Sequence, residues 1–302
     1  MMDLTVRIGS RTLNNPIGVA SGTFGYGSEY EKLIDLNSIG ALYTKAVTPE
    51  PRPGNDVPRI VETPSGMLNS IGLANVGLER FINEKLPFLK SVPSAVIVNV
   101  AGAEQRDYHT VIETLAAEDG IWGWEINLSC PNVKCGGLAL GTDPTLVENL
   151  TSELRALTEK PLIIKLTPNV TDITAIARAA EQGGADAVSC INTLVGMLID
   201  TEHQRPILPG GTGGLSGPAV LPIGLAAVYR VSRAVEIPVI GVGGILEPDH
   251  ALQYLLAGAA AVQVGTANFI DPQIHQRIFE TIEAYGERHD LRAVREIGSL
   301  LQ

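Results

Sequence analysis

The chain is poor in cysteine: only Cys130, Cys135 and Cys190 occur among its 302 residues. So small and odd a set argues against a disulfide framework and suits a reducing compartment, which predicts a cytoplasmic protein. Cys130 and Cys135 have no histidine near them, and their spacing differs from the common zinc and iron–sulfur sites. No metal is therefore expected.

Positive charge and long apolar runs are also scarce. The chain has 22 Lys and Arg against 33 Asp and Glu, a formal net charge of −11, and no basic patch. Nucleic acid and anionic membranes are therefore not expected as partners. No run reaches the roughly 18 apolar residues of a membrane-spanning helix. The start of the chain lacks the basic and apolar segments of a signal peptide, so none is expected.

A dinucleotide-binding fingerprint is missing as well. The two nearest matches to G-x-G-x-x-G, at 211–216 and 241–246, end in Ser and Leu instead of Gly. Rossmann-type binding of a dinucleotide is therefore not indicated. A mononucleotide-type cofactor with a single phosphate fits the chain better.

What the chain does have is a unit that recurs eight times, a short apolar run usually followed by a helical pattern. Most runs are continuously apolar, as in strands buried on both faces. This predicts one (β/α)8 barrel domain over residues 1–302, with an open doubly wound sheet as the alternative. The predicted strands are 16–21, 41–46, 95–100, 124–130, 162–166, 187–192, 238–243 and 260–265. The predicted helices are 29–36, 78–89, 108–117, 144–157, 172–182, 219–233, 248–256 and 272–285.

Three further segments extend this pattern. Residues 4–13 predict a β-hairpin, which we expect to lie across the bottom of the barrel. Long insertions follow the second and sixth strands, at 47–94 and 193–236. In a barrel both insertions fall at the carboxyl ends of the strands, where functional sites are built.

Small and polar residues stand where the predicted strands end, and all should converge on one mouth of the barrel. A lysine at the end of a buried strand is costly unless it meets an anion or reaches solvent, and Lys45 and Lys165 both occupy such positions. The glycines after strands seven and eight predict a phosphate site, to which the helix from 248 would add its dipole. A plain tight turn is the alternative for those glycines.

The segment 124–133 combines an apolar strand with a polar end. Between Asn127 and Asn132 it presents an amide, a hydroxyl, a thiol and a second amide. A thiol has a pKa of about 8.5 and can act as a base or nucleophile near neutral pH. A buried structural thiol is the alternative for Cys130, and it is the preferred interpretation of Cys190, which lies inside an apolar strand. The role of Cys135 stays open.

The residues 127–133, Asn-Leu-Ser-Cys-Pro-Asn-Val, resemble the active-site signature of class 1 dihydroorotate dehydrogenases. The similarity covers nearly the whole chain, in matching order, at 20–22, 44–46, 69–73, 164–166, 191–193, 213–217 and 241–244. Cys130 matches class 1, because class 2 enzymes carry Ser at that position. Residues 134–137 resemble the NAD-linked class 1B more than the fumarate-linked class 1A.

The resemblance implies a barrel with one FMN per chain that oxidises (S)-dihydroorotate to orotate in de novo pyrimidine biosynthesis. It implies that Cys130 is the catalytic base and that Lys45 supplies positive charge near flavin and substrate. The implied FMN-binding residues are Ser21, Lys45, Ala46, Asn99, Asn127, Lys165, Ile191, Gly217, Gly243, Gly244, Gly265 and Thr266. The implied substrate-binding residues are Lys45, Asn69, Ser70, Ile71, Gly72, Leu73, Asn127, Asn192 and Thr193. The loop 131–141 would close over them as a lid and bring in Asn132.

Class 1B enzymes imply an assembly as well. A homodimer core of this chain would join two partner subunits that carry FAD and a [2Fe–2S] cluster, giving a heterotetramer that reduces NAD⁺. Four alternatives remain open. They are a class 1A enzyme working alone with fumarate, a subunit similar to dihydropyrimidine dehydrogenase, a non-redox phosphate-binding barrel, and a barrel that serves only as a scaffold.

Overall fold

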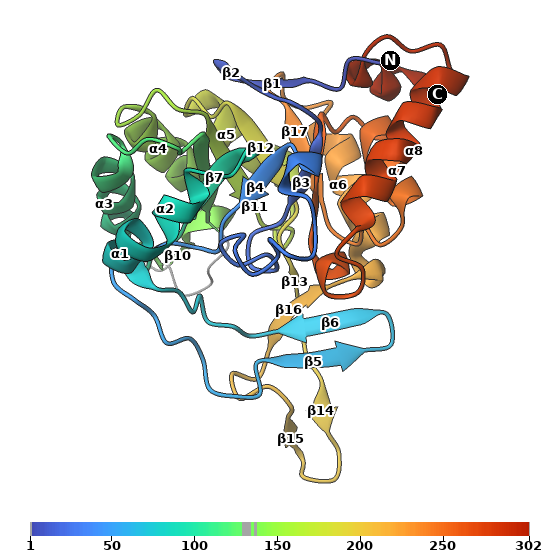
Figure 1. Cartoon of the computed structure of the whole chain (residues 1–302). Coiled ribbons are helices and arrows are strands. Elements are labelled where there is room, and N and C mark those ends of the chain that lie inside the picture. Colours follow the sequence, from blue (N-terminus) through green and yellow to red (C-terminus); the bar gives the residue numbers. More distant parts are fainter. Residues whose placement is uncertain (1, 129–133, 136–137, 302) are drawn as a thin grey trace.

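The computed structural model describes residues 2–128, 134–135 and 138–301. Eight parallel strands close into a barrel at the centre of the fold, as predicted (Figure 1). Around the barrel they follow one another in chain order, and the last pairs with the first. They are β3 (Ile17–Val19), β4 (Ala41–Tyr43), β7 (Ala95–Val100), β8 (Gly123–Asn127), β11 (Leu162–Leu166), β12 (Ala187–Cys190), β17 (Val239–Val242) and β18 (Ala261–Val264).

The barrel strands are buried on both faces, which explains their largely apolar sequences. Every residue of β11, β12, β17 and β18 is buried. Helices form the outer layer, and seven of the eight predicted helical segments are helical in the structure. These helices are α1 (Gly77–Arg80), which continues through the π-turn η2 (Phe81–Lys85) into α2 (Leu86–Leu89), then α3 (Gln105–Leu115), α4 (Pro144–Arg155), α5 (Ile173–Gln182), α6 (Leu221–Val231), α7 (Pro248–Leu256) and α8 (Ile274–Arg288).

Caps in the sequence determine where several helices begin. Asp143 precedes α4, and its side chain accepts a hydrogen bond from the backbone N–H of Leu146 at 3.1 Å. Asp172 caps α5 in the same way through the N–H of Thr174 at 2.9 Å. Each cap satisfies an amide that has no partner inside the helix, so the helix start is stabilised by about 1 kcal/mol.

The helix predicted at 29–36 does not form. Residues 21–35 make consecutive turns instead, followed by a short 3-10 helix, η1 (Leu36–Ser38). Gly25 and Gly27, just before the predicted helix, adopt positive φ and belong to the same series of turns. The carboxylate of Glu29 accepts from the N–H of Tyr26 at 3.0 Å, and the hydroxyl of Tyr30 donates to the carbonyl of Thr23 at 3.0 Å. These side-chain bonds stabilise the turns, so the apolar periodicity of 29–36 was a wrong guide here.

The N-terminal hairpin consists of β1 (Val6–Ile8) and β2 (Arg11–Leu13), as predicted. Arg11 donates to the carbonyls of Ile121 and Trp122, which immediately precede β8, at 3.2 and 2.8 Å. Gly9 has a φ of +55° and lies so close to Asp186, just before β12, that a Cβ there would collide with that side chain. The hairpin therefore covers the amino-terminal ends of the barrel strands, opposite the insertions in Figure 1.

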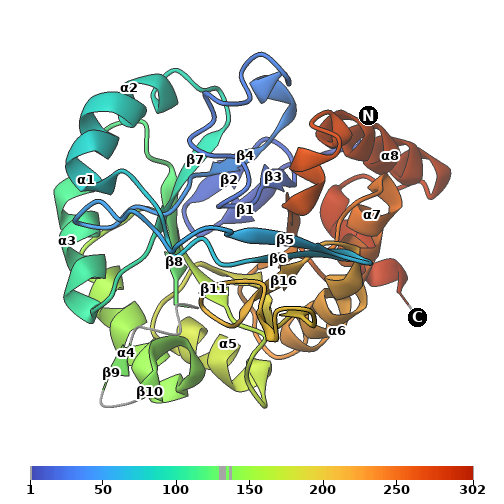
Figure 2. The ribbon, with the colours of Figure 1, turned by 90° about the horizontal axis from the view of Figure 1, so that it is seen from below.

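The two insertions combine into one small sheet at the other end of the barrel. The first insertion contributes β5 (Ile60–Thr63) and β6 (Gly66–Asn69), and the second contributes β13 (Leu194–Gly196) and β16 (Gly213–Ser216). The antiparallel order is β13-β16-β6-β5, and β16 pairs with β6 so that Gly214 faces Asn69. Figure 2 shows this sheet passing across the barrel mouth. Segments far apart in the sequence are thereby joined beside the predicted site.

Short elements complete the described structure. They are β9 (Lys134–Cys135), β10 (Leu138–Ala139), β14 (Ile199–Asp200), β15 (Arg205–Pro206) and the 3-10 turns η3 (Leu140–Thr142), η4 (Pro218–Val220), η5 (Thr266–Phe269) and η6 (Val294–Leu300). Among the residues described, no helix is both long enough and apolar enough to cross a bilayer.

Candidate functional site

The predicted site residues that the structure describes all lie at one end of the barrel. They follow or end the barrel strands, or belong to the two insertions that cover the mouth. From the strands come Ser21, Lys45, Ala46, Asn99, Asn127, Lys165, Ile191, Asn192, Thr193, Gly243, Gly244, Gly265 and Thr266, and from the insertions come Asn69, Ser70, Ile71, Gly72, Leu73 and Gly217.

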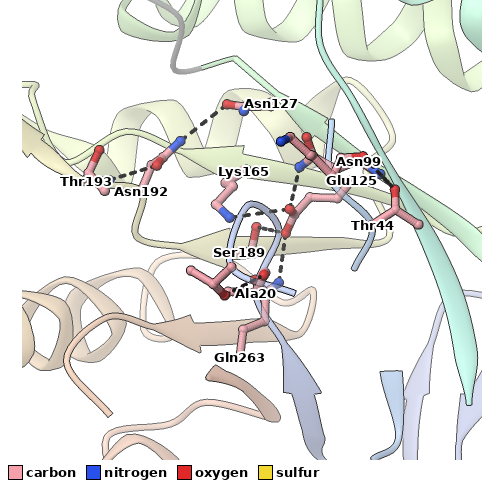
Figure 3. Close-up of polar contacts among 12 residues, drawn as sticks. Ala20, Thr44, Asn99, Glu125, Asn127, Lys165, Ser189, Asn192, Thr193 and Gln263 are labelled. Carbon is pink, nitrogen blue, oxygen red and sulfur yellow. Dashed lines mark hydrogen bonds and ion pairs between the residues drawn. The ribbon is translucent and has the colours of Figure 1, made fainter. Parts of the chain in front are cut away.

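A carboxylate that we did not predict as part of the site, Glu125 on β8, lies in the barrel interior beneath this mouth and is 0% exposed. One of its oxygens accepts from Asn99 Nδ2 at 2.7 Å and meets Lys165 Nζ at 3.4 Å. The other accepts from Ser189 Oγ at 2.9 Å and Gln263 Nε2 at 2.8 Å. Figure 3 shows these partners converging from four strands. The available signal was a charged residue inside an apolar strand, because such residues are almost never fully buried unless they are paired.

The two lysines that we predicted at strand ends differ in their surroundings. Lys165 is 5% exposed, and its ion pair with Glu125 compensates a buried charge, so it does not reach solvent as the alternative proposed. Lys45 is partly buried, and its backbone N–H donates to the carbonyl of Gly25 at 2.7 Å. Among the described residues its ammonium has no hydrogen-bond or ion-pair partner. Lys45 therefore offers the mouth a cation that is available to an anionic ligand.

The amides predicted to hold substrate meet beside these lysines. Asn192 donates through Nδ2 to the side-chain oxygen of Asn127 at 3.3 Å and accepts from the backbone N–H of Thr193 at 2.8 Å. Asn169, which we did not predict, supports this loop. It donates to the carbonyl of Thr193 and accepts from the N–H of Val195, both at 3.0 Å. Its position after β11 was the one available sequence signal.

The predicted substrate loop 69–73 is held by its own insertion. Asn69 ends β6 and donates through Nδ2 to the carbonyl of Gly214 at 3.2 Å, which ties it to the strand that adjoins Thr193. The hydroxyl of Ser70 accepts from Asn55 Nδ2 at 2.8 Å. Gly72 and Leu73 both have positive φ, at +71° and +56°, so the loop turns sharply there. The loop is therefore preformed beside the second insertion.

The glycines predicted to hold phosphate follow the neighbouring barrel strands β17 and β18, and Gly217 follows β16. Thr266 at the start of η5 donates to the hydroxyl of Ser216 at 3.0 Å, next to Gly217. A Cβ on Gly243 would lie 3.8 Å from Ile191, so these two predicted residues are neighbours. Gly243 and Gly244 have positive φ, and their amides make no hydrogen bond to any described residue. Their N–H groups remain available to an anion.

The amides just before α7, the helix predicted to add its dipole to these glycines (the glycine cradle), have partners within the chain. The amides of Leu246 and Glu247 both donate to His250 Nδ1 at 3.2 Å, and Glu247 caps the first turn of α7. The amino terminus of α7 is thus already satisfied by its own capping box. The amides of Gly243 and Gly244 are therefore the donors that the described residues leave available here, and the contribution of the dipole of α7 stays a prediction.

Tyr254 on α7 supports the glycine cradle through a hydrogen bond to Gly243. Its hydroxyl donates to the carbonyl of Gly243 at 2.7 Å, and burial raises the pKa of that hydroxyl far above its usual range. The ring lies against Gly241, where an added Cβ would come within 2.4 Å of it. The tyrosine is therefore a fixed, protonated donor that positions Gly243.

The structure places the side chain of Cys190 but not that of Cys130. Cys130 and Asn132 lie outside the described residues, so the role of Cys130 as base stays a prediction. Cys190 is fully buried in β12, and burial raises the pKa of its thiol well above the usual range. Cys190 is therefore a core thiol, as predicted.

The donors and acceptors of the mouth are consistent with FMN. Asn99 Oδ1 is buried and has no hydrogen-bond partner among the residues described, so it awaits a donor from a ligand. The glycine amides suit one phosphate, and the two lysines suit a ring that takes up negative charge. Within the same described residues, no three His, Cys, Asp or Glu side chains cluster as metal ligands.

A second cleft, of about 450 Å³, lies at the opposite end of the barrel beneath the hairpin. Its basic side chains are already occupied: Arg11 donates to two carbonyls, and Lys160 donates to the carbonyls of Ala116 and Glu118 at 3.1 and 2.9 Å. The cleft shares no residue with the predicted site. The mouth at the carboxyl ends is therefore the candidate site.

Comparison with known proteins agrees with this architecture. A family model described as dihydroorotate dehydrogenase matches residues 3–285. Three proteins named dihydroorotate dehydrogenase B (NAD(+)), catalytic subunit, are similar to the chain. The protein from Geotalea uraniireducens is 52% identical over 300 residues, covering 99% of this chain and 98% of that protein. The one from Geobacter sulfurreducens is 51% identical over 299 residues, with the same coverage. The one from Bacteroides thetaiotaomicron is 49% identical over 302 residues, covering both chains completely. The chain belongs to the dihydroorotate dehydrogenase family.

Proposed function

We propose that this chain is the catalytic subunit of an NAD-linked dihydroorotate dehydrogenase. It oxidises (S)-dihydroorotate to orotate in pyrimidine biosynthesis, and its electrons pass through a partner subunit to NAD⁺. The observation that carries the proposal is the mouth itself. There the side chains of Asn127 and Asn192 are hydrogen-bonded to each other, and the Lys45 ammonium, the buried Asn99 Oδ1 and the amides of Gly243 and Gly244 have no partner within the described part of the chain. Full-length identity to relatives named as NAD(+) enzymes favours this class over the fumarate-linked one.

The substrate side of the mouth recognises a planar ring with an imide edge and a carboxylate. Amides offer both donors and acceptors, so Asn69, Asn127 and Asn192 suit the imide edge. The ammonium of Lys45 suits the negative carboxylate. Because loop 69–73 and Thr193 are joined through Gly214, they present their polar groups in a preformed arrangement. Such preorganisation lowers the entropy lost on substrate binding.

The chemistry removes a proton and a hydride from adjacent carbons. Cys130 takes the proton from the carbon beside the ring carbonyl, either as a thiolate or through a nearby hydroxyl or water. The chemistry that bound FMN would supply is acceptance of the hydride from the carbon that bears the carboxylate. Lys165 provides positive charge where negative charge develops at the cofactor site. The residues proposed to hold FMN are Ser21, Lys45, Ala46, Asn99, Asn127, Lys165, Ile191, Gly217, Gly243, Gly244, Gly265 and Thr266.

The proposed assembly has two copies of this chain and two electron-transfer subunits that carry FAD and a [2Fe–2S] cluster. The designation of the relatives as catalytic subunits supports a separate partner. Exposed apolar side chains on the second insertion, Val195, Met197 and Ile199, support a protein contact at this end of the molecule.

Anaerobic addition of dihydroorotate to the purified, FMN-loaded chain is expected to bleach the visible flavin absorbance. NAD⁺ should restore the absorbance only when the electron-transfer subunit is present. Dihydrouracil, which lacks the carboxylate that Lys45 would bind, serves as the control and should not bleach it. Absence of bleaching by dihydroorotate would reject the function. Reoxidation by fumarate but never by NAD⁺ with the partner would reject the NAD-linked class.

Tyr254→Phe is expected to weaken FMN binding several-fold and to lower the free energy of unfolding by about 1 kcal/mol, because Gly243 loses the hydroxyl that holds its carbonyl. Fluorescence titration of FMN and urea denaturation measure the two effects. Tyr229→Phe is the matched control, since Tyr229 is exposed on the neighbouring helix α6. Equal FMN affinity for both variants would show that Tyr254 does not position the cradle.

A further inference from the structure

Glu125 has a full set of hydrogen-bond donors. As a carboxylate it only accepts, and its two oxygens accept from two side chains each. These donors come from β7, β11, β12 and β18, so the carboxylate links four strands around the barrel. It is completely buried, and no part of it is left to contact a substrate. Its effect on the site must therefore act through the side chains that it holds.

The first of these side chains is Asn99. Because a carboxylate cannot donate, the NH₂ of Asn99 has to face Glu125, and its Oδ1 has to face elsewhere. That Oδ1 is the buried acceptor without a partner among the described residues. The same logic applies to Gln263, whose Nε2 faces Glu125 and whose Oε1 is likewise unpartnered there. Glu125 thus determines that Asn99 presents an acceptor, rather than a donor, to a ligand.

The second is Lys165. Its ammonium lies 3.4 Å from Glu125, and both groups are removed from solvent, so their charges act as a nearly neutral pair. A lone buried cation would attract negative charge in the mouth strongly, because the interior screens charge poorly. The paired cation attracts it less. The pair therefore moderates how strongly the site favours a ligand that gains negative charge.

We propose that Glu125 is a positioning residue that sets the charge balance and the hydrogen-bond polarity of the cofactor site, and that it thereby lowers the reduction potential of bound FMN. This inference rests on the proposed binding of FMN. It assigns a function to a residue that touches neither substrate nor cofactor.

The test is the midpoint potential of the FMN-loaded Glu125→Gln variant, measured against reference dyes without dihydroorotate. Glutamine preserves the shape. Its oxygen can still accept from Asn99 and Lys165, while its NH₂ can donate to the Ser189 hydroxyl and to Gln263 after that amide flips. We expect the variant to fold and to favour reduced over oxidised FMN about tenfold more than the unmodified chain. A tenfold change in this ratio corresponds to a rise of about 30 mV in the midpoint potential of a two-electron couple.

Ser189→Ala is the matched control, because it removes one hydrogen bond from Glu125 and leaves the charge in place. Its potential should stay close to that of the unmodified chain. A shift of equal size in both variants, or no shift in Glu125→Gln, would overturn the proposal and leave Glu125 a structural residue.

Removing both charges provides a second measurement that does not depend on the single variant folding. Lys165→Met should lower the potential, and adding Glu125→Gln to it should raise the potential again, because the double variant loses the pair as a unit. No rise on that addition would also overturn the proposal. The potential is measured with a chemical reductant, so a failure of dihydroorotate to react would reject the proposed function alone. A chain that binds no FMN would overturn both.

Discussion

Replacing Cys130 by alanine is expected to lower kcat about 10²- to 10⁴-fold at neutral pH, the usual contribution of a general base. The protein should stay yellow, because Cys130 is not among the predicted FMN contacts, and all of these except Asn127 come from segments other than β8. Steady-state turnover with dihydroorotate and the flavin content of the purified variant measure the two effects. The activity of the unmodified chain should rise with pH through the pKa of the thiol, since only the thiolate accepts the proton. The alanine variant should lack this rise.

Cys135→Ala is the control for that experiment. Cys135 lies five positions further along the chain, outside the polar segment that frames Cys130, and its replacement should leave turnover and the pH profile unchanged. Equal losses in the two variants would contradict the assignment of the base. Loss of bound FMN in Cys130→Ala would instead indicate that the segment supports the cofactor.

Gly214→Ala is expected to lower kcat/KM for dihydroorotate about 10²-fold, the effect of displacing a binding group by roughly 1 Å. An added Cβ would lie 2.2 Å from Thr193 Oγ1 and 2.7 Å from Thr193 Cβ, which is closer than atoms can approach. The loop that carries Thr193 would have to move. The same residue also accepts from Asn69, so both predicted substrate segments are disturbed at once.

Gly210→Ala in the same insertion provides the comparison. A Cβ there meets only Ser70 Oγ at 3.6 Å, an ordinary contact, so kinetics should be unchanged. The affinity for FMN should change far less than kcat/KM in Gly214→Ala, because Gly243, Gly244 and Gly265 follow the barrel strands β17 and β18 and only Gly217 follows β16. A Gly214→Ala variant with normal kcat/KM would contradict the view that the joined insertion sheet organises the substrate side.

The barrel itself was predictable because its strands carry the signal of their own burial. Continuous apolar runs such as β17 occur where both faces of a strand are covered, and eight largely apolar runs in succession favour a closed barrel. The helix expected at 29–36 failed for the opposite reason. There the bonds of Glu29 and Tyr30 to the turns that precede them outweigh a short apolar periodicity.

The candidate site was predictable as a set of residues but not as an arrangement. Strand ends identify which side chains converge, because parallel strands all finish at the same edge of a barrel. They do not reveal that Lys165 is paired while the ammonium of Lys45 has no partner among the residues that the structure describes, since both lysines follow similar apolar segments. That difference depends on Glu125, which lies on another strand.

By itself the sequence determined the barrel, the end of the barrel at which the site lies and the kinds of side chain that gather there. These follow from burial and from the positions of strand ends, which are local properties of each segment. Only the tertiary structure decided the rest. The pairing of β6 with β16, the charge balance between Glu125 and Lys165, and the acceptor that Asn99 presents all depend on contacts between segments far apart in the chain. Such contacts leave no pattern in any one segment. The paired residues acquire their charge balance and hydrogen-bond polarity only when folding brings them together.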